Sequence, residues 1–246
     1  MQTSYRIAGL WRYPVASIGG EAVSSAIVGA QGVMGDRMYG LFDAVSRAPA
    51  APEKDRRWHK ALSLTATLND DGTTTIRFPD NNEIELSAAS APIHLSDFFG
   101  FDVGIGQIGS EPYGTDFPSL QHRQPHFPIH LLSTGSLGYL AQLREVDSVD
   151  VRRFRPNILL QPTTNDEEAC FAEAAWIGKR GRTRDVALAV VEEATRCGMT
   201  IIPQPGVEDD AEILRTILRR NRRRLGAYCT VAETGVLSVG DHFELT

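Results

Sequence analysis

The sequence contains little cysteine and no long apolar run. Three cysteines among 246 residues are too few for a disulfide framework or a four-cysteine cluster. No stretch approaches the roughly 18 apolar residues that a membrane-spanning helix needs, and the first residues lack the apolar segment of a secretory signal. These absences favour a globular, cytoplasmic protein that does not bind membranes.

Excess positive charge is also missing. The formal net charge is −6, with 42% hydrophobic and 23% charged residues, an ordinary globular composition. Proteins that bind nucleic acid usually carry a basic excess, so we expect no nucleic-acid partner. Only Lys54, Lys60 and Lys179 are lysine, and the other 22 basic residues are arginine. An arginine-rich genome would explain this bias, but guanidinium groups also bind phosphate and carboxylate through paired hydrogen bonds.

Alternation of apolar and polar residues predicts strands over most of the chain. We expect helices only in the second half, over residues 134–144 and 208–224, and a proline-rich loop over residues 109–128 between the halves. The predicted fold is mostly β with peripheral helices (α+β), with a barrel as its centre. Its predicted domains are an N-terminal β region, residues 1–108, and a second domain, residues 109–246. The strands are expected over residues 5–15, 22–28, 37–43, 62–68, 73–78, 83–86, 157–161, 186–191, 227–231 and 236–245.

Residues 152–157, RRFRPN, form the most informative stretch. Alternate side chains of an extended strand share one face, which would align Arg153, Arg155 and Asn157 over about 13 Å as a cradle for an oxyanion. The alternative is an exposed edge strand with solvated arginines, which Pro156 would suit.

A helix N-terminus provides a second candidate anion site. Residues 131–137, LLSTGSL, predict a short strand that enters a helix at Ser133 and Thr134. Free N–H groups at such a position bind phosphate, although every capped helix presents a similar pattern.

Cys197 is the candidate nucleophile or metal ligand because it follows an apolar strand and adjoins Arg196. A cation beside a cysteine favours the thiolate, which is the form that attacks or binds a metal. The alternative is an unreactive buried thiol. Cys170 and Cys229 have apolar neighbours and are expected to be core residues.

A series of histidines and a run of arginines are each explained better by structure than by function. His122, His126 and His130 are spaced as metal ligands on one helix would be, but the prolines between them prevent a helix. The run RRNRRR over residues 219–224 ends an expected helix, where cations favour the helix dipole, so we assign it to a solvated face.

The order of these pieces resembles the MOSC superfamily, named for the C-terminal domain of molybdenum cofactor sulfurases. It is similar to members of the amidoxime-reducing and YcbX types, which combine an N-terminal β-barrel region with a MOSC domain. The N-terminal resemblance rests on LWRYPV at 10–15, GDR at 35–37 and FD at 42–43. The MOSC resemblance rests on STGSL at 133–137, RFRPN at 153–157, F-x-E-x-x-W at 171–176, the pair at 196–197 and GVLSVGD at 235–241.

This resemblance implies a molybdopterin-binding oxidoreductase that reduces N-hydroxylated or related N- and S-oxide small molecules. Its electrons would come from a separate reductase, ferredoxin or cytochrome b5-type protein. Cys197 would be catalytic and would bind molybdenum as a thiolate beside the pterin dithiolene. Pyridoxal phosphate is a further ligand compatible with the resemblance. The residues implied to hold the pterin or its phosphate are Arg37, Ser133, Thr134, Arg153, Arg155, Asn157 and Arg196.

Two departures from the family pattern keep other functions open. Ala16 stands where the pattern has lysine, with Arg12 as the nearest replacement, and residues 200–206 lack the expected aspartate. One alternative is a sulfur-carrier or molybdopterin-handling protein with a persulfide on Cys197. Another is a divergent member that binds a different small anion without the cofactor.

Overall fold

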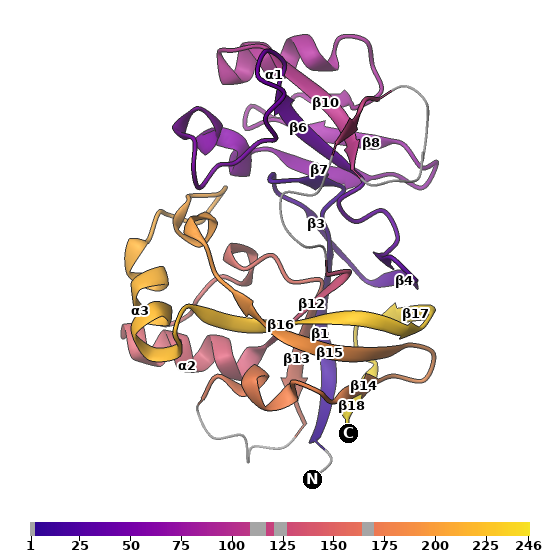
Figure 1. Ribbon diagram of the computed structural model, residues 1–246, viewed down its shortest axis with the longest axis vertical. Helices are drawn as coiled ribbons and strands as arrows, with labels where there is room; N and C mark the ends of the chain where they lie inside the picture. Colours follow the sequence, from indigo (N-terminus) through magenta and orange to yellow (C-terminus); the bar gives the residue numbers. More distant parts are fainter. Residues whose placement is uncertain (1–2, 109–116, 121–126, 164–169) are drawn as a thin grey trace.

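The computed structural model describes residues 3–108, 117–120, 127–163 and 170–246. The chain forms two parts that lie one above the other along the long axis of the molecule (Figure 1). The first holds most of the N-terminal half, and the second is a β-barrel that both termini enter. No helix in the described ranges is long and apolar enough to cross a membrane.

Seven strands close the barrel in the order β13-β12-β16-β15-β14-β18-β1, and β1 pairs back onto β13. Only β12 and β13 run parallel to each other. Closure leaves these seven strands without a free edge, and the interior of the barrel is filled by side chains such as Ile7, Leu131 and Phe243, all fully buried. The strands are β1 (Thr3–Arg12), β12 (Ile129–Ser133), β13 (Ile158–Pro162), β14 (Arg180–Arg182), β15 (Ala187–Thr195), β16 (Arg224–Glu233) and β18 (His242–Leu245).

The first part contains two small sheets packed around an aromatic core. The Trp58 ring makes edge contacts with Phe99 and Phe101, at 4.7 and 4.8 Å between ring centroids. One sheet has the order β11 (Ser119–Leu120), β10 (Val103–Ile108), β6 (Tyr39–Asp43), β2 (Val15–Ala16). The other is the meander β7 (Thr65–Leu68), β8 (Thr74–Arg77), β9 (Glu83–Glu85), accompanied by a 3-10 helix (Arg56–Ser63) and α1 (Ala91–Phe99).

A third small sheet combines two strands from the first part of the sequence with one from near its C-terminus. β17 (Gly235–Ser238) pairs with β4 (Ser25–Gly29), which pairs with β5 (Gly32–Val33). β3 (Glu21–Val23) extends the barrel sheet from β1. Segments from the two halves of the sequence are therefore hydrogen-bonded at this level of the molecule.

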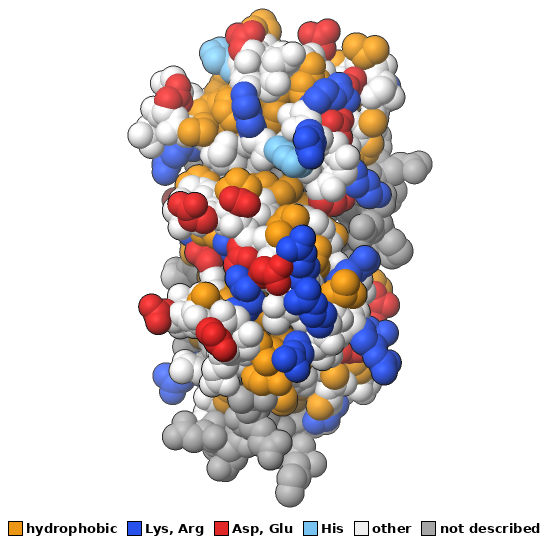
Figure 2. Space-filling view, turned by 90° about the vertical axis from the view of Figure 1, so that its left-hand side faces the viewer, with side chains coloured by type: hydrophobic (Ala, Val, Ile, Leu, Met, Phe, Trp, Pro, Cys, Tyr) orange, Lys and Arg blue, Asp and Glu red, His pale blue; other side chains and the backbone are white. Residues whose placement is uncertain are grey.

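Two helices pack beside the barrel. α2 (Thr134–Arg144) and α3 (Ala211–Asn221) bury Leu140 and Ile217 in a shared cluster, and Arg144 pairs with Asp210 at 2.7 Å. The opposite face of α3 is polar, as its amphipathic sequence predicts, and basic side chains gather on this side of the molecule (Figure 2). Short 3-10 helices also occur at Val151–Arg153, Ala172–Trp176 and Gly198–Ile201.

The predicted fold class, mostly β with a barrel and peripheral helices, is confirmed. The expectation of helices only in the second half is wrong, because α1 lies in the first. Its buried residues Ala91, Leu95 and Phe99 recur every four positions, a helical period too short to stand out in a proline-containing sequence. The expected strand over 236–245 is two strands, separated by a turn in which Gly240 has φ 96°.

The domain division at residues 108 and 109 stays a prediction. In space, β1 from the first segment completes the barrel, and β11 from the second pairs with β10. The two cores are therefore not separated at a single point in the sequence.

Candidate functional site

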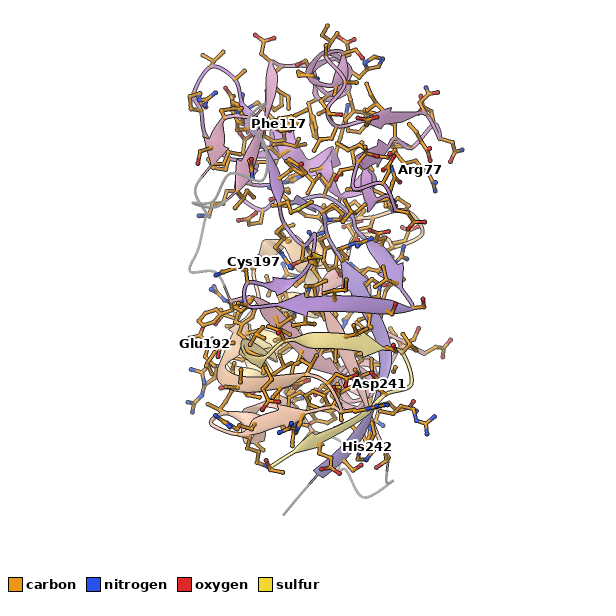
Figure 3. The ribbon with its side chains drawn as sticks, turned by 90° about the vertical axis from the view of Figure 1, so that its right-hand side faces the viewer. Arg77, Phe117, Glu192, Cys197, Asp241 and His242 are labelled. Carbon is orange, nitrogen blue, oxygen red and sulfur yellow. The ribbon has the colours of Figure 1, made fainter. Side chains whose placement is uncertain are left out.

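A cavity of about 350 Å³ lies between the barrel and the sheet that contains β2, β6 and β10. The wall from the first part includes the apolar residues Leu41, Pro49 and Ile108 together with Ser17 and one acidic residue, Glu53. The barrel wall contains Cys197, which lies at the level between the two parts (Figure 3). Five arginines line the cavity, namely Arg37, Arg153, Arg155, Arg196 and Arg223.

Four of these arginines, Arg153, Arg155, Arg196 and the exposed Arg223, form no ion pair with a described acidic residue, whereas Arg37 pairs with Asp36. Arg153 and Arg196 are 7% and 5% exposed, and no carboxylate of a described residue lies within ion-pairing distance of either, or of Arg155. Two buried donor atoms, Arg155 Nη2 and Arg196 Nε, have no hydrogen-bond partner within the described structure. Buried charges without partners are costly, so the cavity is suited to an anionic ligand that would supply the missing acceptors.

Arg155 does not belong to an extended strand, so the predicted alignment over residues 152–157 is wrong. Residues Val151–Arg153 form a 3-10 helix, and Arg155 has φ 53° in the left-handed region. The turn arises because Asp150 caps this helix by accepting the N–H of Arg152 at 2.8 Å. The side chains nevertheless reach one cavity, through a turn rather than through strand alternation.

Tyr13 holds two of the arginines together. The Arg155 and Arg37 guanidinium carbons lie 4.2 and 5.1 Å from the centroid of its buried ring, within cation–π range. Arg37 also donates to the carbonyl oxygen of Arg155 at 3.3 Å and to the Asp36 carboxylate. Sequence reasoning gave neither Tyr13 nor Asp36 a role in the site, although both belong to the motifs at 10–15 and 35–37 on which the N-terminal resemblance rests.

The two neighbouring cations differ in electrostatic support. Burial, with a further contribution from the charge of Arg37, lowers the pKa of Arg155 to about 10, so Arg155 still carries its charge at neutral pH. Burial would lower the pKa of Arg37 as well, but the Asp36 carboxylate outweighs it and holds that pKa above its ordinary value. Arg155 is therefore the cation with the most to gain from a bound anion.

Two other predicted binding residues, Arg153 and Asn157, form hydrogen bonds with the protein backbone. Arg153 donates to the carbonyl oxygens of Thr200 and Glu208, at 3.2 and 2.5 Å. The Asn157 side chain accepts the N–H of His130 at 3.1 Å and donates to the carbonyl of Trp11 at 3.4 Å. Both line the cavity, but these bonds make them residues that position the surrounding turns.

Arg196 uses some of its donors within the protein and keeps one without a partner. It donates to the carbonyl oxygen of Phe154 at 2.9 Å and to the hydroxyl of Tyr228 at 3.3 Å, which leaves its Nε facing no acceptor.

Ser133 and Thr134 are not among the residues that line the cavity. The Ser133 hydroxyl caps α2 by accepting the N–H of Gly135, and its own N–H donates to the buried carboxylate of Glu173 at 2.9 Å. Glu173 also accepts the Ser136 hydroxyl at 2.7 Å. A carboxylate thus already occupies the position at which a phosphate was expected. Of the eight predicted site residues, the structure brings six together and leaves these two elsewhere.

Cys197 is partly exposed and borders the cavity. It has extended backbone at the start of the 3-10 helix Gly198–Ile201, and its carbonyl oxygen accepts the N–H and hydroxyl of Thr200. Cys229 is a buried core residue as predicted, and burial raises the pKa of its thiol. The same expectation for Cys170 is wrong, because that side chain is exposed.

Within the described ranges, no group of three or more His, Cys, Asp or Glu residues could hold a metal ion. Of the three histidines considered as ligands, only His130 lies in the described part of the chain. It is buried in β12, apart from any such group. A metal at Cys197 would therefore need most of its ligands from a cofactor.

His130 supports the site as a neutral side chain. Its Nδ1 lies 3.3 Å from the carbonyl oxygen of Arg155, and since a carbonyl can only accept, Nδ1 carries the proton. Gly226, at φ 86°, lies so close to Nε2 that a Cβ there would collide with the ring. Burial, assisted by the charge of Arg196, lowers the pKa of His130 well below its ordinary value of 6.5.

This depressed pKa predicts a stability loss in acid. As the pH falls through 6.5 the unfolded chain takes up a proton at His130 that the folded chain does not, so the free energy of unfolding falls with a slope from this group that approaches about 1.4 kcal/mol per pH unit. Urea denaturation from pH 8 to 5 should show a shallower decline for His130→Gln than for the wild type. His59→Gln, at an exposed position, serves as control. Identical slopes for all three proteins would contradict the assignment.

The chain is similar to known proteins in both sequence and fold. The family model for the MOSC domain matches residues 118–244, more than half of the chain. Human mitochondrial amidoxime-reducing component 1 is 26% identical, over 96% of this chain and 81% of its own. The crystal structure of the YuaD protein from Bacillus subtilis has a similar fold, with a TM-score of 0.52 at 13% identity, over 100% of this chain and 97% of its own. The chain therefore belongs to the MOSC domain family.

Proposed function

We propose that this protein is a molybdenum-cofactor oxidoreductase that reduces N-hydroxylated or related N- and S-oxide small molecules with electrons from a separate protein. The observation that carries the proposal is the cavity in which arginines without acidic partners face Cys197. Membership of the MOSC family and similarity to a human protein named as an amidoxime-reducing component support the same assignment.

The residues present fit a molybdopterin. Its phosphate is a dianion that accepts several hydrogen bonds, and Arg155 Nη2 and Arg196 Nε are buried donors that lack acceptors. Cys197 offers a thiolate, a ligand type that suits such a metal centre. A cavity of about 350 Å³ is within the usual size range of small-molecule sites. Arg37, Arg155 and Arg196 would hold the phosphate end, while Arg153 and Asn157 would keep the turns in place.

The cofactor, when bound, supplies a centre for two-electron reduction. A substrate R–NHOH would there take up two electrons, supplied by the separate protein, and two protons, and would leave as R–NH₂ and water. The protein positions the anionic end through Arg155, whose carbonyl oxygen is fixed by His130 Nδ1 and Arg37. Leu41, Pro49 and Ile108 give the cavity apolar surface, and a bound cofactor would displace water from it, which would strengthen the electrostatic interactions there.

Ala16 borders the cavity at the position where the family pattern has lysine. Arg12 does not replace that cation, because it pairs with Glu21 at 2.8 Å and donates to the carbonyl of Leu68. We assign the missing charge to the pair Arg37 and Arg155 instead, which Tyr13 holds side by side.

The test is the molybdenum and pterin content of the protein after expression in a host that makes the cofactor. We expect near one molybdenum and one pterin per chain in the wild type and loss of the metal in Cys197→Ala. Cys170→Ala, at an exposed cysteine, is the matched control and should keep its metal. Full metal retention by Cys197→Ala would disprove the ligand assignment. Sulfane sulfur on Cys197 without metal would instead indicate a persulfide carrier, and neither group, in a host whose other molybdoenzymes are loaded, a cofactor-free anion-binding protein.

A further inference from the structure

The C-terminal end of α3 carries a basic surface that borders the cavity. Figure 2 shows Lys and Arg side chains grouped on this side of a molecule whose net charge is −6. We name it the α3 surface and define it by Arg215, Leu218, Arg219, Arg220, Arg222 and Arg223, all exposed. The helix dipole accounts for cations in the last turn, but not for those beyond it or for the apolar residue among them.

Part of the positive charge on this surface is not neutralised. Arg215 and Arg219 share the carboxylate of Glu212. Arg220, Arg222 and Arg223 form no ion pair with any carboxylate of the described chain. Leu218 is 53% exposed among them. Arginines around an exposed apolar residue are typical of protein interfaces.

The α3 surface is also connected to the candidate site. Arg222 and Arg223 have φ values of 50° and 70°, and this left-handed turn brings Arg223 to the wall of the cavity. The carbonyl oxygen of Arg223 accepts the N–H of Arg196 at 2.8 Å. Since Arg196 precedes Cys197, one hydrogen bond joins the surface to the residue next to the candidate metal ligand.

We propose that the α3 surface is the docking site for an acidic electron-carrier protein. This inference rests on the proposed function, which needs reducing equivalents from another protein. Charge complementarity predicts that the partner is negatively charged. The chain has a net charge of −6, so an acidic protein is attracted to it only at a surface where positive charge collects. The connection to Arg196 explains why a carrier would bind here, since a protein bound to the α3 surface lies beside the cavity.

A nucleic acid fits the same surface less well. Glu212 lies between Arg215 and Arg219 of this surface, and Glu193 pairs with the adjoining Arg224, and both carboxylates would repel a continuous polyanion. A folded protein with separate acidic groups can match such a mixed arrangement, with an apolar contact at Leu218.

Binding measurements on the complete protein test the proposal. The probes are two acidic electron carriers, a plant-type [2Fe–2S] ferredoxin and the haem domain of a b5-type cytochrome, titrated calorimetrically at low salt and at about 0.2 M salt. We expect at least one to bind the wild type with salt-sensitive affinity. The double variant Arg219→Glu/Arg220→Glu should weaken that binding about tenfold or more at low salt. Arg219→Gln/Arg220→Gln should show a smaller loss.

The matched control is Arg77→Glu/Arg184→Glu, which reverses two exposed arginines outside α3 and should bind as the wild type does. Thermal unfolding of every variant verifies that the fold is retained. Salt-sensitive binding of neither probe to the wild type, or equal affinities for the α3 and control variants, would overturn the proposal. So would binding of a single-stranded oligonucleotide that displaces the carrier. None of these measurements requires molybdenum, so failure of the docking proposal is distinguishable from failure of the proposed function.

Discussion

Arg155→Gly is expected to weaken anion binding about 100-fold without lowering the stability of the folded protein. Loss of a charge-assisted hydrogen bond costs about 1.5–3 kcal/mol, and about 2.8 kcal/mol corresponds to a factor of 100. Stability should hold because Arg155 combines a left-handed φ of 53° with a buried donor that has no partner. Glycine adopts that conformation without steric cost, and removing a poorly compensated buried charge offsets two losses, the contact with Tyr13 and the hydrogen bond from Arg155 Nη1 to the carbonyl oxygen of Ile18.

The measurement pairs urea denaturation with two binding readouts: affinity for inorganic pyrophosphate, and pterin retained after dialysis. Arg47→Gly is the matched control, because Arg47 is exposed, has φ 62° and also lies over an aromatic ring, but is not among the cavity-lining residues. It should show the same relief of backbone strain with unchanged binding. Arg155→Ala, which loses the charge and keeps the strained φ, should bind as weakly as the glycine variant and be less stable. Unchanged pyrophosphate affinity in Arg155→Gly would mean that the anion site lies elsewhere.

Backbone strain concentrates around the cavity. Eight described residues other than glycine have positive φ, and four of them, Ser17, Arg37, Arg155 and Arg223, line it. Such conformations are retained where the surroundings over-determine them, and they cluster at functional sites. Three of the four are arginines, so the conformation that costs stability is also the one that turns positive charge toward the cavity. We infer that ligand binding, rather than folding alone, accounts for these positions.

The sequence predicts the barrel and the second-half helices because their signals are local. Period-two alternation marks the strands, and Ser133 and Asp210 are N-cap residues that mark where α2 and α3 begin. The sequence also identified Cys197 and four of the five arginines that the structure brings to one cavity, whereas Arg223, which was assigned to a solvated face, lines the cavity as well. Their residue types, and the order in which they occur, carry that information.

The arrangement of the site was not predictable in the same way. Strand alternation predicted Arg153 and Arg155 on one face. The observed turn instead depends on the Asp150 cap and on the left-handed conformation of Arg155, which arginine does not favour and which its local sequence therefore does not predict. The expected phosphate position at α2 is taken by Glu173, which is 40 residues away from Ser133 in the sequence. The cation–π contact of Tyr13 with Arg155, and the hydrogen bond from Arg37 to the carbonyl oxygen of Arg155, likewise join residues more than a hundred positions apart. Contacts between distant segments decide these features.

Asp36→Asn is expected to have the opposite effect to Arg155→Gly: the folded state loses about 3 kcal/mol, and anion binding is not weakened. The Asp36 side chain is only 3% exposed and pairs with Arg37, and removing one partner of a buried pair leaves the other charge uncompensated. Asparagine can still accept the N–H of Tyr13, which Asp36 Oδ1 accepts at 2.8 Å, so the turn itself is kept. Asp55→Asn, which breaks a more exposed pair with Arg57, should cost much less.

The anion provides the decisive comparison between the two variants. Without its carboxylate, Arg37 directs its full charge toward the cavity, so pyrophosphate should restore more of the stability of Asp36→Asn than it adds to the wild type, following the usual dependence on ligand concentration and affinity. The same additions should leave Arg155→Gly almost unaffected. Denaturation midpoints at increasing pyrophosphate concentration measure both. If Asp36→Asn lost no more stability than Asp55→Asn, or gained none from the anion, Arg37 would be a structural cation and the binding charge would rest on Arg155 and Arg196 alone.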